Sequence, residues 1–360
     1  MGATPGLAVL AAGCSTGESQ PAAAPTGTMP RGTAAPAVAP APPRPELVHV
    51  FSNSPPHIVE IDATTNRITR TKDVPNLGVW ATNDDNCYWD GNNAWLAARN
   101  PTNSDVEVFL LNLDTLEVGR RIPLGKDATT VYVGKGSLSK NQLVVAKHAS
   151  GEMVVIDTNT FAVLDTKAVP VNGGVACDMD VATGPDGIER AFIPTDTGDT
   201  TVAYNTATRE VIGTFTHTRT VRPYMLTASP DGRYVWVQER TTDGNSVLNA
   251  QTMQLVQHVP TGKGAFVNTF SPDGRLCYVS HANDTRMVVV NAAPPFALVK
   301  EIEVGTNAQV TAPLASGRAV YTIANRESSV AAISTANWAV TKIQLPENPA
   351  FVFARPAARR

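Results

Sequence analysis

Short apolar runs that end in a small polar residue recur along the chain from about residue 46 to its end. In each run, Val, Ile, Leu and Tyr occupy alternating or consecutive positions, and a turn rich in Asn, Asp, Thr or Gly follows. Runs of this length and composition, bounded by turn residues, are typical of β-strands. Helical periodicity is scarce over the same residues, so the pattern predicts an all-β fold.

One unit of this pattern repeats: an apolar run ends in an anchoring polar residue, a short turn follows, and a second β-rich run comes next. The anchoring residues are Asp62, Asn112, Asp157, Asn205, Asn249, Asn291 and Ser334. They lie 42 to 50 residues apart. This period matches a β-propeller blade of about four strands. We therefore predict a seven-bladed β-propeller over residues 46–360.

The blade that contains Asn249 shows the expected strands most clearly. PYMLTA, RYVWVQ, NSVLN and QLVQHV are its four strands, and SPDG is the turn between the first two, where Asp and Gly suit the turn backbone. The first unit lacks an innermost strand, whereas AFVFARPA follows the last unit. We expect residues 351–355 to supply that strand and close the first blade, because closure removes an unpaired sheet edge.

The first 45 residues differ in composition. GLAVLAAGC, residues 6–14, is a short apolar run that ends in a cysteine, as in a bacterial lipoprotein signal, although no Lys or Arg precedes it. We expect residues 1–14 to be this signal, Cys14 to be lipidated, and residues 15–45, rich in Pro and Ala, to be a disordered tether. The alternative is a disordered tail without a lipid. With the lipid, the protein is extracytoplasmic, in the periplasm or at the cell surface, and contacts the membrane only through this anchor.

Charge and cysteine spacing exclude several classes. The 29 Lys and Arg residues against 32 Asp and Glu residues give a net charge of -3, so we expect no nucleic-acid partner. The four cysteines form no CxxC or CxxCH, which argues against a disulfide framework, a zinc site and covalent haem. Cys87, Cys177 and Cys277 are expected to be buried as small apolar side chains. Nucleotide-binding and hydrolase motifs are also lacking from the sequence.

The repeats resemble a known family. YVWVQERTTDGNSVLN, CYVSHANDTRMVVVN and VVAKHASGEMVVIDTNT are similar to repeats of YVTN-type (YncE-like) seven-bladed propellers of the bacterial cell envelope, although the letters YVTN do not occur. Propellers of quinoprotein amine dehydrogenase heavy chains and of haem d1 nitrite reductases are also similar.

The resemblance implies a monomeric binding or interaction module whose partner is a small molecule or an envelope protein. Because related propellers also serve enzymes, the alternative is a lactonase- or lyase-like enzyme, or a redox accessory that holds a haem d1- or quinone-type cofactor. The cofactor, if any, stays unknown.

In a propeller, the loops between successive blades and between the second and third strands of a blade share one face around the central channel. Loops on a rigid scaffold carry function most often. The candidate ligand-binding residues on this face are His148, Asp178, His217, Arg222, Tyr224, Glu239 and His281. Further polar residues of equivalent loops are His57, Lys147, Asp196, Arg240, Asn325 and Arg326.

This set suggests two kinds of ligand. Histidines with carboxylates can bind a metal, and arginines can bind an anion. No two histidines have close ligand spacing, so we predict no metal site, and no catalytic residue is assigned. For Arg222, a buried ion pair with a carboxylate of a neighbouring blade is equally expected. His49 and His258 lie inside predicted strands and are expected to be structural.

Overall fold

The computed structural model describes residues 45–74, 77, 88–90, 92–100, 102–103, 105–126, 131–133, 141–170, 174–217 and 221–355. These residues lie within one compact unit that spans residues 44–360. Their regular structure consists of strands and one short 3-10 helix, η1 (Asn325–Glu327). The described part of the chain has no helix that is both long and apolar enough to cross a bilayer. Cys14, Cys87 and residues 15–44 of the predicted tether lie outside the described residues.

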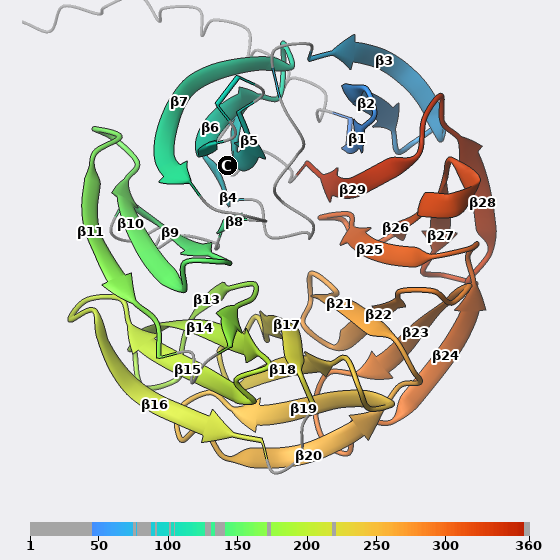
Figure 1. Cartoon of the computed structure of the whole chain (residues 1–360). Coiled ribbons are helices and arrows are strands. Elements are labelled where there is room, and N and C mark those ends of the chain that lie inside the picture. Colours follow the sequence, from blue (N-terminus) through green and yellow to red (C-terminus); the bar gives the residue numbers. More distant parts are fainter. Residues whose placement is uncertain are drawn as a thin grey trace, which may run out of the picture. The chain divides into compact units, whose positions relative to one another are not determined.

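The described strands form six antiparallel sheets, which follow one another around a ring in Figure 1. The first sheet contains β29 (Pro349–Ala354), β1 (Leu47–Asn53), β2 (Pro56–Asp62) and β3 (Arg67–Asp73). The second contains β4 (Tyr88–Asp90), β5 (Asn93–Arg99), β6 (Asp105–Asn112) and β7 (Glu117–Lys126). The third contains β8 (Val131–Val133), β9 (Gln142–Lys147), β10 (Glu152–Asp157) and β11 (Val163–Ala168).

Two of the remaining sheets carry the candidate site. The fourth sheet contains β12 (Val175–Ala176), β13 (Asp180–Thr183), β14 (Glu189–Asp196), β15 (Thr200–Asn205) and β16 (Glu210–Thr216). The fifth contains β17 (Pro223–Ala228), β18 (Tyr234–Glu239), β19 (Gly244–Asn249) and β20 (Leu255–Pro260). The sixth contains β21 (Ala265–Phe270), β22 (Leu276–His281), β23 (Arg286–Asn291), β24 (Leu298–Glu303), β25 (Ala308–Pro313), β26 (Ala319–Ala324), β27 (Ser329–Ser334) and β28 (Val340–Gln344).

The all-β propeller class predicted from the sequence is confirmed. The blade count of seven stays a prediction, because one backbone pair, His281 with Ala308, joins strands β21–β24 to strands β25–β28 in the sixth sheet.

The anchoring residues end strands, as the repeat predicts. They are the last residues of β2, β6, β10, β15, β19, β23 and β27. Asn249 shows the physical reason: its Oδ1 accepts hydrogen bonds from the backbone N–H groups of Gln251 and Thr252, both at 2.9 Å. Oxygens of Asp62, Asn112, Asp157 and Asn205 accept equivalent bonds. The repeated Asn or Asp therefore holds the turn into the outermost strand.

Most outermost strands share a second feature. The pairing register shifts where β3, β7, β11, β16, β20 and β24 meet their neighbours. A bulge in an edge strand twists it and disturbs its row of unpaired backbone groups. The shifts therefore reduce the tendency of these open edges to pair with another chain.

The C-terminal strand closes the first sheet, as predicted. β29 pairs antiparallel with β1, with Val352 opposite Val50. The Phe351 ring stacks on that of Phe51 with 4.1 Å between ring centroids. Immediately after β29, Arg355 donates its backbone N–H to the carbonyl oxygen of Leu47 at 2.8 Å.

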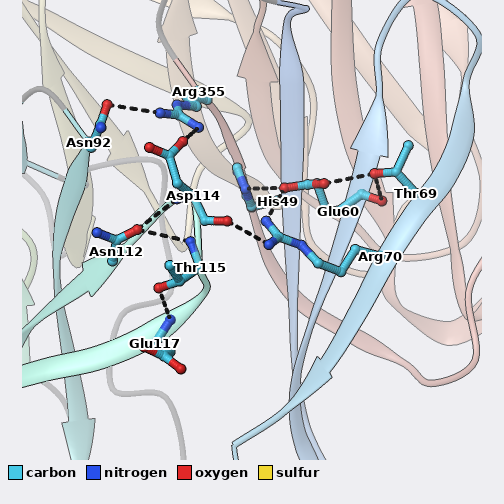
Figure 2. Close-up of polar contacts among 10 residues, drawn as sticks. All are labelled: His49, Glu60, Thr69, Arg70, Asn92, Asn112, Asp114, Thr115, Glu117 and Arg355. Atoms are coloured by element: carbon cyan, nitrogen blue, oxygen red, sulfur yellow. Dashed lines mark hydrogen bonds and ion pairs between the residues drawn. The ribbon is translucent and has the colours of Figure 1, made fainter.

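Side chains then tie this closing segment to the second sheet (Figure 2). The Arg355 guanidinium donates to Asp114 Oδ1 at 2.7 Å and to Asn92 Oδ1 at 3.1 Å. Arg70 of β3 donates to the backbone oxygen of Asp114 at 2.6 Å. Two arginines from the first sheet therefore hold the turn at Asp114.

A buried carboxylate supports Arg70. Burial works to raise the pKa of Glu60, but hydrogen bonds involving His49, Thr69 and Arg70 outweigh it and lower this pKa to about 2. His49 is fully buried, its Nε2 lies 3.5 Å from Glu60 Oε2, and burial lowers its pKa. These contacts give His49 a structural role, as expected for a histidine inside a strand.

The cysteines of the described residues agree with the sequence prediction as well. Cys177 and Cys277 are buried, and neither forms a disulfide among the described residues. Burial raises the pKa of the Cys177 thiol well above its usual range. A buried neutral thiol is inert, so Cys177 serves as packing.

Candidate functional site

Arg222 and Tyr224 lie together at the end of β14 and the start of β17, with an ion pair at the centre of the group. Arg222 donates from Nε and Nη2 to the two carboxylate oxygens of Asp196, at 2.8 and 2.9 Å. The Arg240 guanidinium lies 3.4 Å above the Tyr224 ring centroid, and its Nη1 is 3.5 Å from Asp196. Asp196 belongs to the neighbouring sheet, so Arg222 makes the expected ion pair between sheets, but its side chain is 38% exposed rather than buried.

Asp178 and His281 are bound mainly by backbone groups. The carboxylate of Asp178 accepts the N–H groups of Met179 at 2.7 Å and Leu226 at 2.8 Å, which links the fourth sheet to the fifth. His281 is fully buried, with Nε2 2.9 Å from the carbonyl oxygen of Thr261, and burial lowers its pKa. The contacts of Asp178 and His281 therefore hold neighbouring strands in position.

The other loop candidates are dispersed over different sheets. The His148 ring lies 6.2 Å from that of Tyr132, and Lys147 pairs with Glu152 at 2.8 Å. Arg326 donates to Asn283 Oδ1 at 3.0 Å. The remaining two are His57, which is buried in β2, and Asn325, which donates to the Pro349 carbonyl oxygen.

His217 and Glu239, in contrast, line one cavity between the fourth and fifth sheets. His217 directly follows β16, and Glu239 ends β18. The cavity has a volume of about 440 Å³. We call it the Glu239 pocket, and its lining residues are Phe215, His217, Val221, Glu239, Thr242, Asp243, Ser246, Leu255 and His258. In Figure 1 its strands β16, β19 and β20 lie on the outer side of the ring, away from the central channel.

Glu239 is the buried charged group of this pocket, with 3% of its surface exposed. Thr242 donates to its Oε2 at 2.6 Å, and Ser246 donates to its Oε1. His217 Nδ1 and His258 Nδ1 each lie 3.6 Å from a carboxylate oxygen. Burial works to raise the pKa of Glu239, but the hydrogen bonds with His217, Ser246 and Thr242 outweigh it and lower this pKa. The carboxylate is therefore ionised at neutral pH.

The second nitrogen of each imidazole also has a partner. His217 Nε2 lies 3.2 Å from Thr201 Oγ1, and His258 Nε2 lies 3.3 Å from Asp243 Oδ1. The Phe215 ring packs edge-on against His217 with 4.7 Å between centroids. Both imidazoles are thus oriented with Nδ1 toward Glu239. Among the described residues, no group of three or more His, Cys, Asp or Glu side chains is arranged to hold a metal ion.

Sequence reasoning found this pocket in part. His217 and Glu239 come from the two loop classes that the repeat singles out, and Asp243 and Thr242 follow Glu239 in the less repetitive stretch QERTTDG. His258 was expected to be structural because it lies inside a strand. That strand is the outermost of its sheet, so one of its edges is unpaired and most of its side chains are exposed, and this was the available signal.

No family model and no curated protein matches the chain. Solved structures do. A periplasmic gluconolactonase of Pseudomonas aeruginosa is 16% identical, with a TM-score of 0.69 over 87% of this chain and 99% of that one. A candidate 6-phosphogluconolactonase from Bacteroides fragilis is 14% identical, with a TM-score of 0.69 over 88% and 100%. Hydrazine synthase from Kuenenia stuttgartiensis is 12% identical, with a TM-score of 0.62 over 78% and 90%. At these identities the likeness shows the fold alone.

Proposed function

We propose that the protein is an exported, lipid-anchored β-propeller that binds a small molecule in the Glu239 pocket. One observation carries this proposal: two side chains predicted as ligand-binding from the sequence, His217 and Glu239, line the same cavity. Its volume, about 440 Å³, suits a small organic ligand, since such sites commonly measure about 300–1,000 Å³. The proposal includes a seven-bladed, YVTN-type propeller in which strands β21–β24 and β25–β28 are separate blades.

The state of Glu239 favours binding over proton transfer. An effective general base has a pKa near the working pH. Hydroxyl and imidazole groups instead lower the pKa of Glu239, which makes it a weak base and a strong hydrogen-bond acceptor. Because Thr201 and Asp243 also fix the two imidazoles, the pocket is preorganised for recognition.

A blocking variant tests the location of the site. Leu255 lines the pocket and is 49% exposed, so Leu255→Trp narrows the cavity while the buried core stays intact. Leu298 starts β24 as Leu255 starts β20, and Leu298→Trp is the matched control. We expect ligands found by a thermal-shift screen to stabilise the wild type and the control, and to lose this effect in Leu255→Trp. Equal stabilisation of all three proteins would place the ligand elsewhere.

Lactone hydrolysis is the second candidate function. The observation that favours it is the fold likeness to structures named as a gluconolactonase and a candidate 6-phosphogluconolactonase. In the Glu239 pocket, the carboxylate would take a proton from the water that attacks the lactone carbonyl, and would return it to the ring oxygen as the ring C–O bond breaks. The pocket fits an unphosphorylated lactone better, because Glu239 and Asp243 line it, the described lining residues include no Lys or Arg, and like charges repel.

Acid release from gluconolactone and from 6-phosphogluconolactone at pH 7 tests this candidate. If hydrolysis takes place at this site, we expect turnover of gluconolactone, and a rate about 100-fold or more lower in Glu239→Gln. The exposed Glu210 on β16 provides the control Glu210→Gln, which should keep the full rate. Acid release at the rate of buffer alone would leave ligand binding as the function.

A further inference from the structure

Glu239 differs from the other buried glutamates of the described residues in its partners. Glu60 pairs with Arg70, and Glu107 pairs with Arg121. Glu239 is just as buried, yet its partners among the described residues are two hydroxyls and two imidazoles, with no Lys or Arg. Burying a carboxylate without a Lys or Arg is costly, and among the described residues only the two imidazoles could balance its charge, when protonated.

The arginine next to Glu239 in the sequence does not neutralise the Glu239 carboxylate. Arg240 follows Glu239 in the sequence, but its guanidinium lies over the Tyr224 ring and beside Asp196. Arg222 is likewise engaged by Asp196. Both cations therefore serve the neighbouring ion-pair group rather than Glu239.

The rest of the lining shows what would complement this charge. Asp243 is a second carboxylate of the pocket, and its side chain is 64% exposed. Phe215, Val221 and Leu255 provide apolar surface, and an aromatic face also attracts cations. A buried carboxylate, an exposed carboxylate and apolar walls together suit a cation attached to an apolar body.

We infer that the Glu239 pocket takes an organic cation: an ammonium group that contacts Glu239, carried by an apolar body that packs against Phe215, Val221 and Leu255. This inference rests on the proposed function, because it names the ligand class of the same pocket. A bare metal ion fits less well, since no set of three donor side chains in the described residues is arranged around one point.

Calorimetric titration of the full chain with three probes of similar shape tests the ligand class. The probes are benzylamine, which is cationic at pH 7, benzyl alcohol, which is neutral, and benzoate, which is anionic. We expect benzylamine to bind at least tenfold more tightly than benzyl alcohol, and benzoate to bind most weakly. Glu239→Gln should weaken benzylamine binding at least tenfold and change benzyl alcohol binding little, while Glu210→Gln should leave both unchanged.

Two variants separate failure of the inference from failure of the proposed function. Leu255→Trp should weaken benzylamine binding, and Leu298→Trp should not. If benzylamine and benzyl alcohol bind equally well and Leu255→Trp weakens both, the cation preference is wrong and the pocket remains the site. If benzylamine binding is the same in Leu255→Trp as in the wild type, or if no probe binds, the inference is overturned. Glu239→Gln is informative only if it unfolds cooperatively. If it does not, the affinities of benzylamine and benzyl alcohol for the wild type and for Leu255→Trp decide whether the pocket prefers a cation.

Discussion

Glu60, Glu107 and Glu239 are buried side chains with different surroundings. Arginines neutralise the first two, and both ion pairs link adjacent strands of a sheet. Glu239 has neutral hydrogen-bond donors instead. Glu60 and Glu107 are thus neutralised within the fold, whereas Glu239 lies beside hydroxyls and imidazoles and is the one of the three that lines the pocket.

The Glu60 pair predicts a pH dependence of stability. The folded-state pKa of Glu60 is about 2, below its ordinary value of 4.5. A depressed pKa stabilises the folded state above pH 4.5, and this contribution, up to about 3 kcal/mol, is lost as the pH falls from 4.5 toward 2. We therefore expect the difference in unfolding free energy between wild type and Glu60→Gln, measured with urea, to shrink over that range. A difference that stays constant from pH 6 to pH 2 would contradict this role.

Individual site residues were only partly predictable, because their partners come from other sheets. Loop position alone singled out Asp178 and His281 together with His217 and Glu239. The structure shows that the carboxylate of Asp178 accepts the backbone N–H of Leu226 in the fifth sheet, besides that of Met179, and that His281 Nε2 lies against the Thr261 carbonyl oxygen. Such partners depend on how neighbouring sheets are placed, which no local pattern encodes.

Strands and turns were predicted well, because their causes are local. The alternation of apolar residues specifies each strand, and the side chain of Asn249 or its equivalents accepts bonds from the turn that follows. PYMLTA corresponds to β17 without a shift. The bulges in the outermost strands left no comparable sequence signal. The residue that a bulge adds, such as Leu164 or Val256, is neither Gly nor Pro.

The closing strand has a measurable energetic role. Phe351 of β29 is fully buried and stacks on Phe51 of β1. Phe351→Ala should lower the unfolding free energy by about 3–5 kcal/mol, because it removes a large buried side chain and leaves a cavity. Val340→Ala, at an exposed position of β28, is the control and should change it by about 0.5 kcal/mol or less. Equal effects in urea unfolding would argue against a stabilising closure by β29.

For the whole molecule, closure of the ring was predictable because the first repeat lacks a strand that the C-terminus supplies. The location of the pocket was not predictable. The sequence suggested loops around the central channel, whereas the Glu239 pocket lies between the outer parts of two adjacent sheets. Its formation depends on the packing of β16, His217 and Val221 against β18–β20, which are brought together by the arrangement of the sheets.

The proposed export of the whole chain depends on Cys14. If Cys14 carries a lipid, the wild-type protein expressed in a bacterial host should incorporate labelled palmitate and sediment with membranes. Cys14→Ala should lose the label and appear in the soluble fraction, because one residue carries the anchor. Cys177→Ala keeps Cys14 and is the matched control. Label that persists in Cys14→Ala would rule out lipidation at this residue.

The most direct test of the account is a crystal structure of the protein with benzylamine or with the tightest ligand from the thermal-shift screen. We expect ligand density between β16 and β20, in contact with Glu239 and bounded by His217 and His258. Density at the ion-pair group of Arg222, Asp196 and Tyr224, with the Glu239 pocket unchanged, would contradict the account.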